Sequence, residues 1–166
     1  NHCGFVFQQN YLNDTMSVLD NIMVSGLLTD KNRKRIAEKA KELLSKVDIN
    51  KEAWNKFPTQ LSGGEQQRVA VVRGIINSPA LLFADEPTGA LNSRNTNHVL
   101  DVLTELNKEG QTIVMVTHDM RCARRGNRVK YRQDGVITGE LFLGAYESGN
   151  KERHEKLRHF LQEMGW

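Results

Sequence analysis

Two adjacent carboxylates, Asp85 and Glu86, stand directly after the apolar segment Ala80–Ala84. Such a segment is typical of a strand that is covered on both faces, and functional groups gather where parallel strands end. One carboxylate can hold hydrated magnesium while the next polarises a water molecule, as magnesium nucleotide chemistry requires. Taken alone, the pair is equally consistent with residues that cap the following loop.

Two other apolar segments end in polar side chains in the same way. Gln8 follows the short segment Gly4–Phe7, and His118 follows Thr112–Thr117. Both segments have the length and composition of buried strands, so three predicted strand ends carry groups that can do chemistry. For His118 by itself, a plain buried histidine is the alternative.

The turn Ser62-Gly63-Gly64-Glu65 has the composition of a phosphate-binding helix start. Ser62 can cap the helix, and Glu65 can reach back in a capping box. Paired glycines let a backbone come close to phosphate, and the free N–H groups of a helix start point at the anion. A merely capped helix would explain Ser62 and Glu65 but would leave the two glycines unexplained.

Together these segments resemble the ATPase subunits of ABC transporters. Leu61–Arg68 is similar to the signature motif of that family, and Asp85–Leu91 is similar to the end of its Walker B strand with the D-loop. Gln8 falls at the Q-loop and His118 at the switch histidine. Four motifs stand in the family's order and spacing, and the resemblance covers nearly the whole chain.

The resemblance implies ATP and Mg²⁺ as cofactors and gives each residue a role. Asp85 would hold magnesium through water, and Glu86 would be the base that orients the attacking water. His118 would contact the γ-phosphate, and Gln8 would sense the metal and the nucleotide. The signature residues would touch ATP held mainly by a second ABC ATPase subunit, so a dimer is implied: Ser62, Gly63, Gly64 and Glu65.

The chain departs from the family pattern in two respects. The phosphate loop G-x-x-x-x-G-K-[ST] is absent, and no Gly-Lys pair occurs anywhere. Without the loop, the backbone cradle and the lysine for the β- and γ-phosphates are missing. We therefore expect a truncated chain that lacks its N-terminal part and is inactive alone. Asn92 stands where the D-loop usually has aspartate, which predicts altered communication between the nucleotide sites of a dimer.

The surrounding patterns predict the secondary structure that positions these motifs. Helical periodicity runs over Ser17–Leu28 and Lys31–Val47. A further helix, Ser93–Lys108, lies between two strands, which is the pattern of a parallel crossover. Asp134-Gly135 predicts a hairpin, and Lys151–Met164 has the spacing of an amphipathic helix.

We therefore expect an α/β fold: a partial P-loop NTPase (RecA-like) core with a parallel sheet, a small helical subdomain, and a C-terminal hairpin plus helix. Residues 1–166 would form one ABC ATPase domain that lacks its N-terminal part. The helical subdomain would cover about 12–77. The rest of the core would cover 1–11 and 78–141, and the C-terminal helix 150–165.

Composition fits an ordinary soluble domain, with 39% hydrophobic and 26% charged residues. The net charge of +3 comes from basic runs interleaved with acids, so no nucleic-acid partner is expected. No apolar run approaches the roughly 18 residues that span a bilayer. We expect a cytoplasmic protein that lies on the inner face of the cell membrane when it is assembled.

Gly4–Gln9 and Glu86–Leu91 are most similar to the group that serves lipoprotein release and the export of macrolides and antimicrobial peptides. The implied partner is a separate integral-membrane permease. One of its cytoplasmic helices would dock around Gln8–Leu28. Apolar residues of that segment would take part in docking or belong to the internal core: Tyr11, Leu12, Met16, Val18 and Leu19.

Two other functions are open. A soluble ABC protein of DNA repair or translation would act on nucleic acid, and it predicts long coiled-coil insertions or tandem cassettes, neither of which occurs in the sequence. A non-catalytic module would dimerise through an exposed sheet edge.

Overall fold

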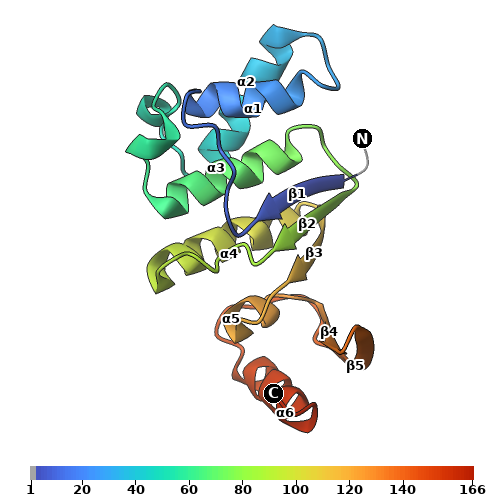
Figure 1. Ribbon diagram of the computed structural model, residues 1–166. Coiled ribbons are helices and arrows are strands. Elements are labelled where there is room, and N and C mark those ends of the chain that lie inside the picture. Colours follow the sequence, from blue (N-terminus) through green and yellow to red (C-terminus); the bar gives the residue numbers. More distant parts are fainter. Residues whose placement is uncertain (1–2) are drawn as a thin grey trace. The chain divides into compact units, whose positions relative to one another are not determined.

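A computed structural model describes residues 3–166 (Figure 1). The chain divides into two units, one ending at Val116 and one running from Thr117 to Trp166. Residues 1 and 2 of the predicted core segment lie outside the described residues. The predicted boundaries of the helical subdomain and the core stay a prediction.

Three parallel strands form the sheet of the first unit, in the order β1 (Cys3–Phe7), β2 (Leu81–Asp85) and β3 (Thr112–Val116). Phe7 pairs with Asp85, and Asp85 pairs with Val116. The strands therefore end at the same level, and the residues that follow β1 and β2 leave the sheet from one edge. The helix α4 (Ser93–Lys108) connects β2 to β3, which confirms the predicted parallel crossover.

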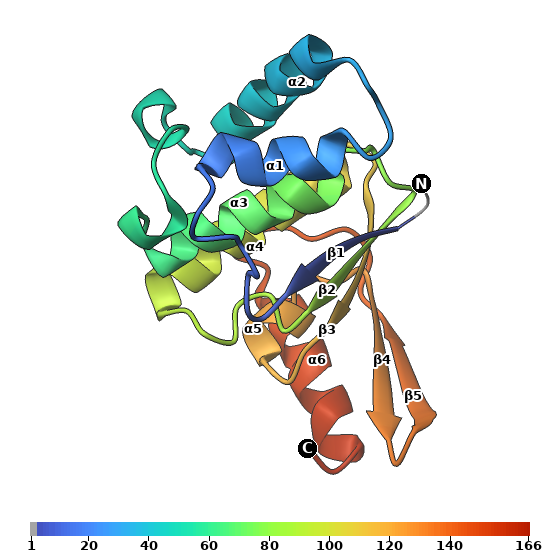
Figure 2. The same cartoon turned by 45° about the horizontal axis from the view of Figure 1, so that its top comes forward.

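The helices of the first unit lie on one side of this sheet (Figure 2). They are α1 (Val18–Gly26), α2 (Arg33–Lys46), α3 (Gly63–Ile75) and α4, with short 3₁₀ turns at Lys51–Ala53 and Pro58–Gln60. Most of the stability of these helices comes from the burial of their apolar faces, because helix propensity alone contributes too little. The centre of the core is fully buried: Val6, Val18, Ile22, Leu44, Val69, Val72, Leu82 and Val99.

The other face of the sheet is open to solvent. Phe5 is 50% exposed and Val116 is 59% exposed. The Phe5 ring stacks on Phe7 and on Phe83, with centroids 5.9 and 5.6 Å apart. The prediction that the strands are covered on both faces therefore holds for one face only, because the helices of residues 3–116 all pack on the same side.

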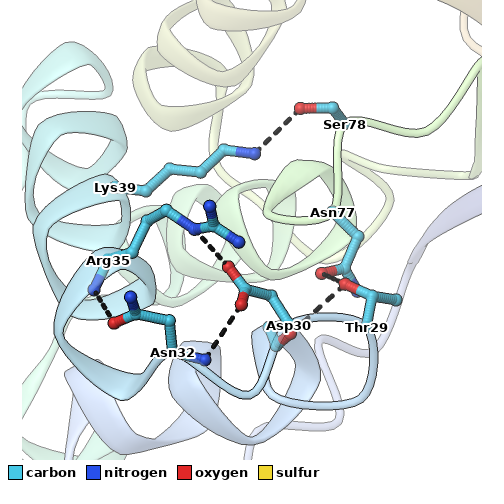
Figure 3. Close-up of polar contacts among 8 residues, drawn as sticks. Thr29, Asp30, Asn32, Arg35, Lys39, Asn77 and Ser78 are labelled. Atoms are coloured by element: carbon cyan, nitrogen blue, oxygen red, sulfur yellow. Dashed lines mark hydrogen bonds and ion pairs between the residues drawn. The ribbon is translucent and has the colours of Figure 1, made fainter.

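Polar contacts fasten the turn after α1 to the end of α3 (Figure 3). Thr29 Oγ1 donates to Asn77 Oδ1 at 2.7 Å, and Asn77 Nδ2 donates to the Ser25 carbonyl at 2.9 Å. Lys39 Nζ of α2 donates to Ser78 Oγ at 2.8 Å. These bonds join segments that are far apart in the sequence, so α1 and α2 are attached to α3 by hydrogen bonds as well as by apolar packing.

The second unit contains α5 (Met120–Ala123), β4 (Arg128–Gln133), β5 (Val136–Phe142) and α6 (Lys151–Glu163). The two strands pair antiparallel, and Asp134 and Gly135 between them have φ values of 49° and 85°. Positive φ at both central residues is the geometry of a tight hairpin turn. The predicted C-terminal hairpin and helix are confirmed. Three residues of α6 form the buried centre of this unit: Leu157, Phe160 and Leu161.

Candidate nucleotide site

The ends of β1 and β2 place three predicted site residues at one edge of the sheet. Because Phe7 pairs with Asp85, Gln8 and Glu86 leave adjacent strands side by side. The Gln8 side chain lies against Gly89, where an added methyl group would come within 2.9 Å of Gln8 Nε2. Gln8 and the acidic strand end thus share one surface with the loop that follows Glu86.

The backbone of Glu86 is held in an unusual conformation. Its φ is +45°, in the left-handed region that costs roughly 1–3 kcal/mol for a residue with a side chain. The Glu86 N–H donates to the Val116 carbonyl at 2.9 Å, and the Glu86 carbonyl accepts from the Gly89 N–H at 3.0 Å. These bonds fix the direction in which the carboxylate leaves the sheet. Strain of this kind, held by its surroundings, is characteristic of functional positions.

The oxygen atoms at this edge are of the kind that binds magnesium. The Asp85 carboxylate is exposed at the strand end, and Gln8 adds an amide oxygen from the neighbouring strand. Within residues 3–166, no three His, Cys, Asp or Glu side chains are grouped as a metal cage. Mg²⁺ commonly takes one or two carboxylates and completes its shell with water and phosphate oxygens, so the donors present fit this ion.

The turn before α3 forms the predicted capping box. Ser62 Oγ accepts from the Glu65 N–H at 3.3 Å, and Glu65 Oε2 accepts from the Ser62 N–H at 2.8 Å. The Ser62 hydroxyl also donates to Glu65 Oε2 at 2.7 Å, and this is the main reason why the pKa of Glu65 lies below its ordinary value. The Glu65 carboxylate is thus engaged in the cap, and its predicted contact with nucleotide stays a prediction.

The two glycines of this turn differ. Gly64 is buried, and an added methyl group would come within 2.6 Å of Asn95 Cγ in α4. Gly63 is exposed, and its added methyl group would meet only Leu91 Cδ2, at an ordinary 3.5 Å. Helix packing therefore requires Gly64 to be glycine but does not require it of Gly63.

The start of α4 lies beside the start of α3. Asn92 caps α4, with its Oδ1 accepting from the Asn95 N–H at 3.0 Å, and Asn95 is the residue that packs on Gly64. Each helix start carries backbone N–H groups without an intrahelical partner and a partial positive charge. Two adjacent helix starts form a surface suited to an anion.

Side chains of α3 hold the backbone on both sides of Gln8. Gln67 Nε2 donates to the Phe7 carbonyl at 2.8 Å. The Arg73 guanidinium donates to both carbonyls of Asn10–Tyr11 at 2.6 Å. The sequence patterns did not single out these residues. The signal that could have found them is a glutamine and an arginine in a helix whose other residues are largely apolar and buried, with Gln67 itself buried and Arg73 half-buried.

A second polar chain orients α3 against α4. The buried Arg68 donates through Nε to the Val47 carbonyl at 2.8 Å, and its Nη1 lies 3.1 Å from His98 Nδ1. His98 Nε2 lies 2.9 Å from Asp48 Oδ2. A guanidinium can only donate, so His98 Nδ1 accepts and Nε2 carries the proton toward Asp48. These bonds connect the end of α2 to α3 and to α4.

His118 belongs to the second unit, whereas the other predicted site residues belong to the first. Its side chain is exposed, and the neighbouring backbone is well fixed. The Asp119 N–H donates to Thr117 Oγ1 at 3.0 Å, and Asp119 caps α5 by accepting from the Arg121 N–H at 2.8 Å. The Arg121 side chain is the main cause that lowers the pKa of Asp119.

The segment predicted to meet a permease contains both exposed and internal residues. Tyr11 is 65% exposed, whereas Val18 is fully buried in the core. Leu12, Met16 and Leu19 are half-buried. Val18 is thus a core residue, and Tyr11 remains available for docking.

A parallel sheet whose strand ends carry Gln8, Asp85 and Glu86, together with two helix starts suited to an anion, defines a nucleotide-binding α/β domain. Residues 1–89 match the ABC transporter family. The chain belongs to the ABC transporter family, and the predicted family and fold class are confirmed.

Known proteins agree with this assignment. The chain is 44% identical over 138 residues to the lipoprotein-releasing system ATP-binding protein LolD of Aquifex aeolicus, covering 83% of this chain and 61% of that protein. It is 46% identical over 145 residues to the macrolide export ATP-binding/permease protein MacB of Chlorobium luteolum, covering 84% of this chain and 21% of that protein.

Solved structures show the same fold. The dimeric structure of the bacterial ABC transporter cassette MJ0796 matches with a TM-score of 0.74 and 37% identity, over 88% of this chain and 65% of that one. The same cassette has also been solved in a post-hydrolysis state with bound ADP and Pi. The chain thus spans somewhat less than two thirds of the length of LolD and of this cassette.

Proposed function

We propose that the protein provides ATP binding and ATP hydrolysis for an ABC transporter, in the setting of peptide, drug or lipoprotein export. The proposal is supported by family membership and by the similarity to LolD and MacB, whose names record lipoprotein release and macrolide export. It is also supported by the grouping of Gln8, Asp85 and Glu86 at one edge of the sheet.

Each residue at this edge has a defined task in the proposal. Bound magnesium would neutralise charge on the nucleotide phosphates. Asp85 would hold the hydrated ion, and Gln8 would offer an amide oxygen from the end of the neighbouring strand β1. Glu86 orients a water molecule and accepts its proton, in a direction fixed by the constrained backbone of that residue. His118 of the second unit contacts the γ-phosphate.

The observation that carries the proposal is the exposed position of Gly63. It is exposed at the start of α3, and packing does not require a glycine there. A bare backbone N–H at a helix start is suited to contact phosphate. We infer that Ser62, Gly63 and Gly64 contact ATP held by a second cassette subunit, and that Asn92 lies beside them. MJ0796, which was solved as a dimer, supports a paired arrangement.

The 166 residues alone are proposed not to turn over ATP, because no Gly-Lys pair occurs in the sequence. The lysine and backbone cradle for the β- and γ-phosphates must then come from elsewhere. Paired with a cassette that has an intact phosphate loop, the chain would still supply a working signature turn.

A mixing experiment tests this function. The chain is added to a LolD-type cassette that keeps its phosphate loop but carries a disabled signature, and ATP hydrolysis is measured. We expect the chain to restore hydrolysis and the Gly63→Arg variant to fail. The control is Ser45→Arg, at an exposed position of α2. Restoration by Gly63→Arg, or hydrolysis by the chain alone, would contradict the proposal.

The proposed partners are an integral-membrane permease and a second ABC ATPase subunit, which would hold the protein on the inner face of the cell membrane. Among residues 3–166, no helix has the length and apolar character needed to cross a bilayer. The name of MacB joins ATP binding and permease in one protein, which supports a permease as the partner of this cassette.

The open sheet face favours a second candidate, in which the 166-residue chain pairs with itself. Parallel sheets are normally covered on both sides, but here the side chains of Phe5 and Val116 are at least half exposed to solvent. Light scattering after gel filtration should show a dimer that Phe5→Ser and Val116→Thr convert to a monomer. Leu28→Ser is the matched control, since Leu28 is 77% exposed on the helical side. A monomeric parent chain would exclude this candidate.

A further inference from the structure

The residue proposed to contact the γ-phosphate, His118, precedes a helix that cannot stand alone. The helix α5 has four residues and is capped by Asp119. Isolated helices shorter than about 12–15 residues are marginal in water, because nucleation fixes several dihedral angles for a single hydrogen bond. The geometry around His118 therefore depends on whatever packs against α5.

The C-terminal helix α6 provides that packing. Its residues Leu157, Phe160 and Leu161 form the apolar centre of the second unit. Met120 and Ala123 of α5 pack against this centre. Residues of α6 thus cover the apolar side of α5 at both of its ends.

A single buried side chain of α6 also fixes the backbone that follows α5. Arg153 is 4% exposed and lies in the first turn of α6. Its guanidinium donates to two carbonyls at the end of α5, those of Arg124 at 2.7 Å and Gly126 at 2.6 Å. It also donates to three carbonyls after β5, at 2.9, 3.1 and 3.2 Å: Leu143, Gly144 and Ala145.

The partners of Arg153 explain why an arginine is needed. Burial lowers the pKa of Arg153, and the charge is met by carbonyl dipoles and by the Tyr146 ring, whose centroid lies 5.5 Å away. A planar guanidinium presents five N–H donors in a fixed fork, whereas an ammonium presents three from one point. Lysine could not reach the two groups of carbonyls at once.

We propose that α6, fastened by Arg153, is the element that positions His118. The backbone on either side of His118 is tied by the Thr117–Asp119 bond and by the Asp119 cap of α5, and Arg153 holds the other end of α5. Arg153 is a positioning residue, since it acts through α5. The importance of the position rests on the proposed role of His118 in ATP hydrolysis.

Nuclear magnetic resonance on the 166-residue chain tests the proposal. In Arg153→Ala, we expect the ring resonances of His118 to shift and amide exchange over 119–123 to accelerate by about tenfold or more. Exchange in β2 of the first unit should not change. Arg153→Lys should show a smaller effect of the same kind. Arg158→Ala is the matched control, because Arg158 on the same helix is exposed and forms an ion pair with Glu155.

The proposal is overturned if His118 and residues 119–123 behave in Arg153→Ala as in the parent chain. If Arg153→Ala unfolds the second unit, Phe160→Leu decides by the same two readouts, since it keeps the guanidinium and reduces the apolar centre on which α5 packs. Neither readout uses nucleotide. A failure of the mixing experiment described above would therefore leave this test intact, and the reverse is also true.

Discussion

The two units hold their predicted site residues by different means. In the first unit, Gln8, Ser62 and Glu86 are placed by long helices and a sheet around a large apolar core. In the second unit, His118 depends on a four-residue helix, a small core and one buried arginine. The positions of the site residues therefore depend on the packing of a large apolar core in the first unit. In the second unit, they depend on a few polar bonds.

The largest expected effect comes from a change in the apolar core of the first unit. Leu82 is fully buried between the sheet and the helices, so Leu82→Ala should destabilise the first unit by about 2–5 kcal/mol. Leu28→Ala, at a 77% exposed position, should cost less than about 0.5 kcal/mol. Urea unfolding followed by Trp54 fluorescence, with Trp166 replaced by Phe in both variants and in the parent, measures both. Equal losses for the two variants would contradict the proposed dominance of the core.

A smaller effect separates packing from function at the signature turn. Gly64→Ala should cost about 1–3 kcal/mol, because the added methyl group would overlap Asn95. Gly63→Ala should leave stability nearly unchanged and reduce hydrolysis in the mixing experiment. Thermal unfolding and the hydrolysis assay, measured on both variants, check the pair. Full activity of folded Gly63→Ala would mean that the exposed backbone there has no part in phosphate contact.

The capping box predicts a dependence on pH. The pKa of Glu65 in the folded chain lies below its ordinary value of 4.5, so its stabilising effect is fully present above that value and is lost as the pH falls through the lower, folded pKa. At pH 7, Glu65→Gln should be less stable than the parent by about 1 kcal/mol. Denaturant titrations between pH 7 and pH 3 should show the difference disappear on acidification. A constant difference would contradict this account.

The smallest expected effect concerns Asn92. Asn92→Asp keeps the cap on Asn95 and adds a negative charge at the start of α4, which should stabilise the helix by about 0.3–1 kcal/mol. Asn150→Asp is the matched control, since Asn150 caps α6 in the second unit through the Arg153 N–H. In the mixing experiment, Asn92→Asp should alter the ATP dependence of hydrolysis and Asn150→Asp should not. Identical kinetics would remove Asn92 from communication between subunits.

Local patterns predicted most of the secondary structure. The apolar segments became β1, β2 and β3, and the Asp134-Gly135 turn became a hairpin. The capping box at Ser62 formed as predicted, because both bonds join residues three apart and need no tertiary partner. The open sheet face was not predicted, because an apolar strand sequence does not record which of its faces has a covering layer.

The residues whose roles the sequence patterns did not reveal share one property. Gln67, Arg73 and Arg153 donate to backbone carbonyls that lie 8 to 63 positions away along the chain. A carbonyl acceptor is the same for every residue type, so no pattern of side chains marks where such a donor will bind. Their roles became visible only when the fold brought the acceptors together.

The sequence by itself determined the family and the order of the motifs, because side-chain type and local spacing carry that information, and it predicted the chemistry of Gln8, Asp85, Glu86 and His118. The tertiary structure decided that Gly64 is needed for packing while Gly63 is not. It also decided that Arg153 holds α5 from a distant helix. Contacts between remote segments depend on the packed core, and the core forms only when the whole chain folds.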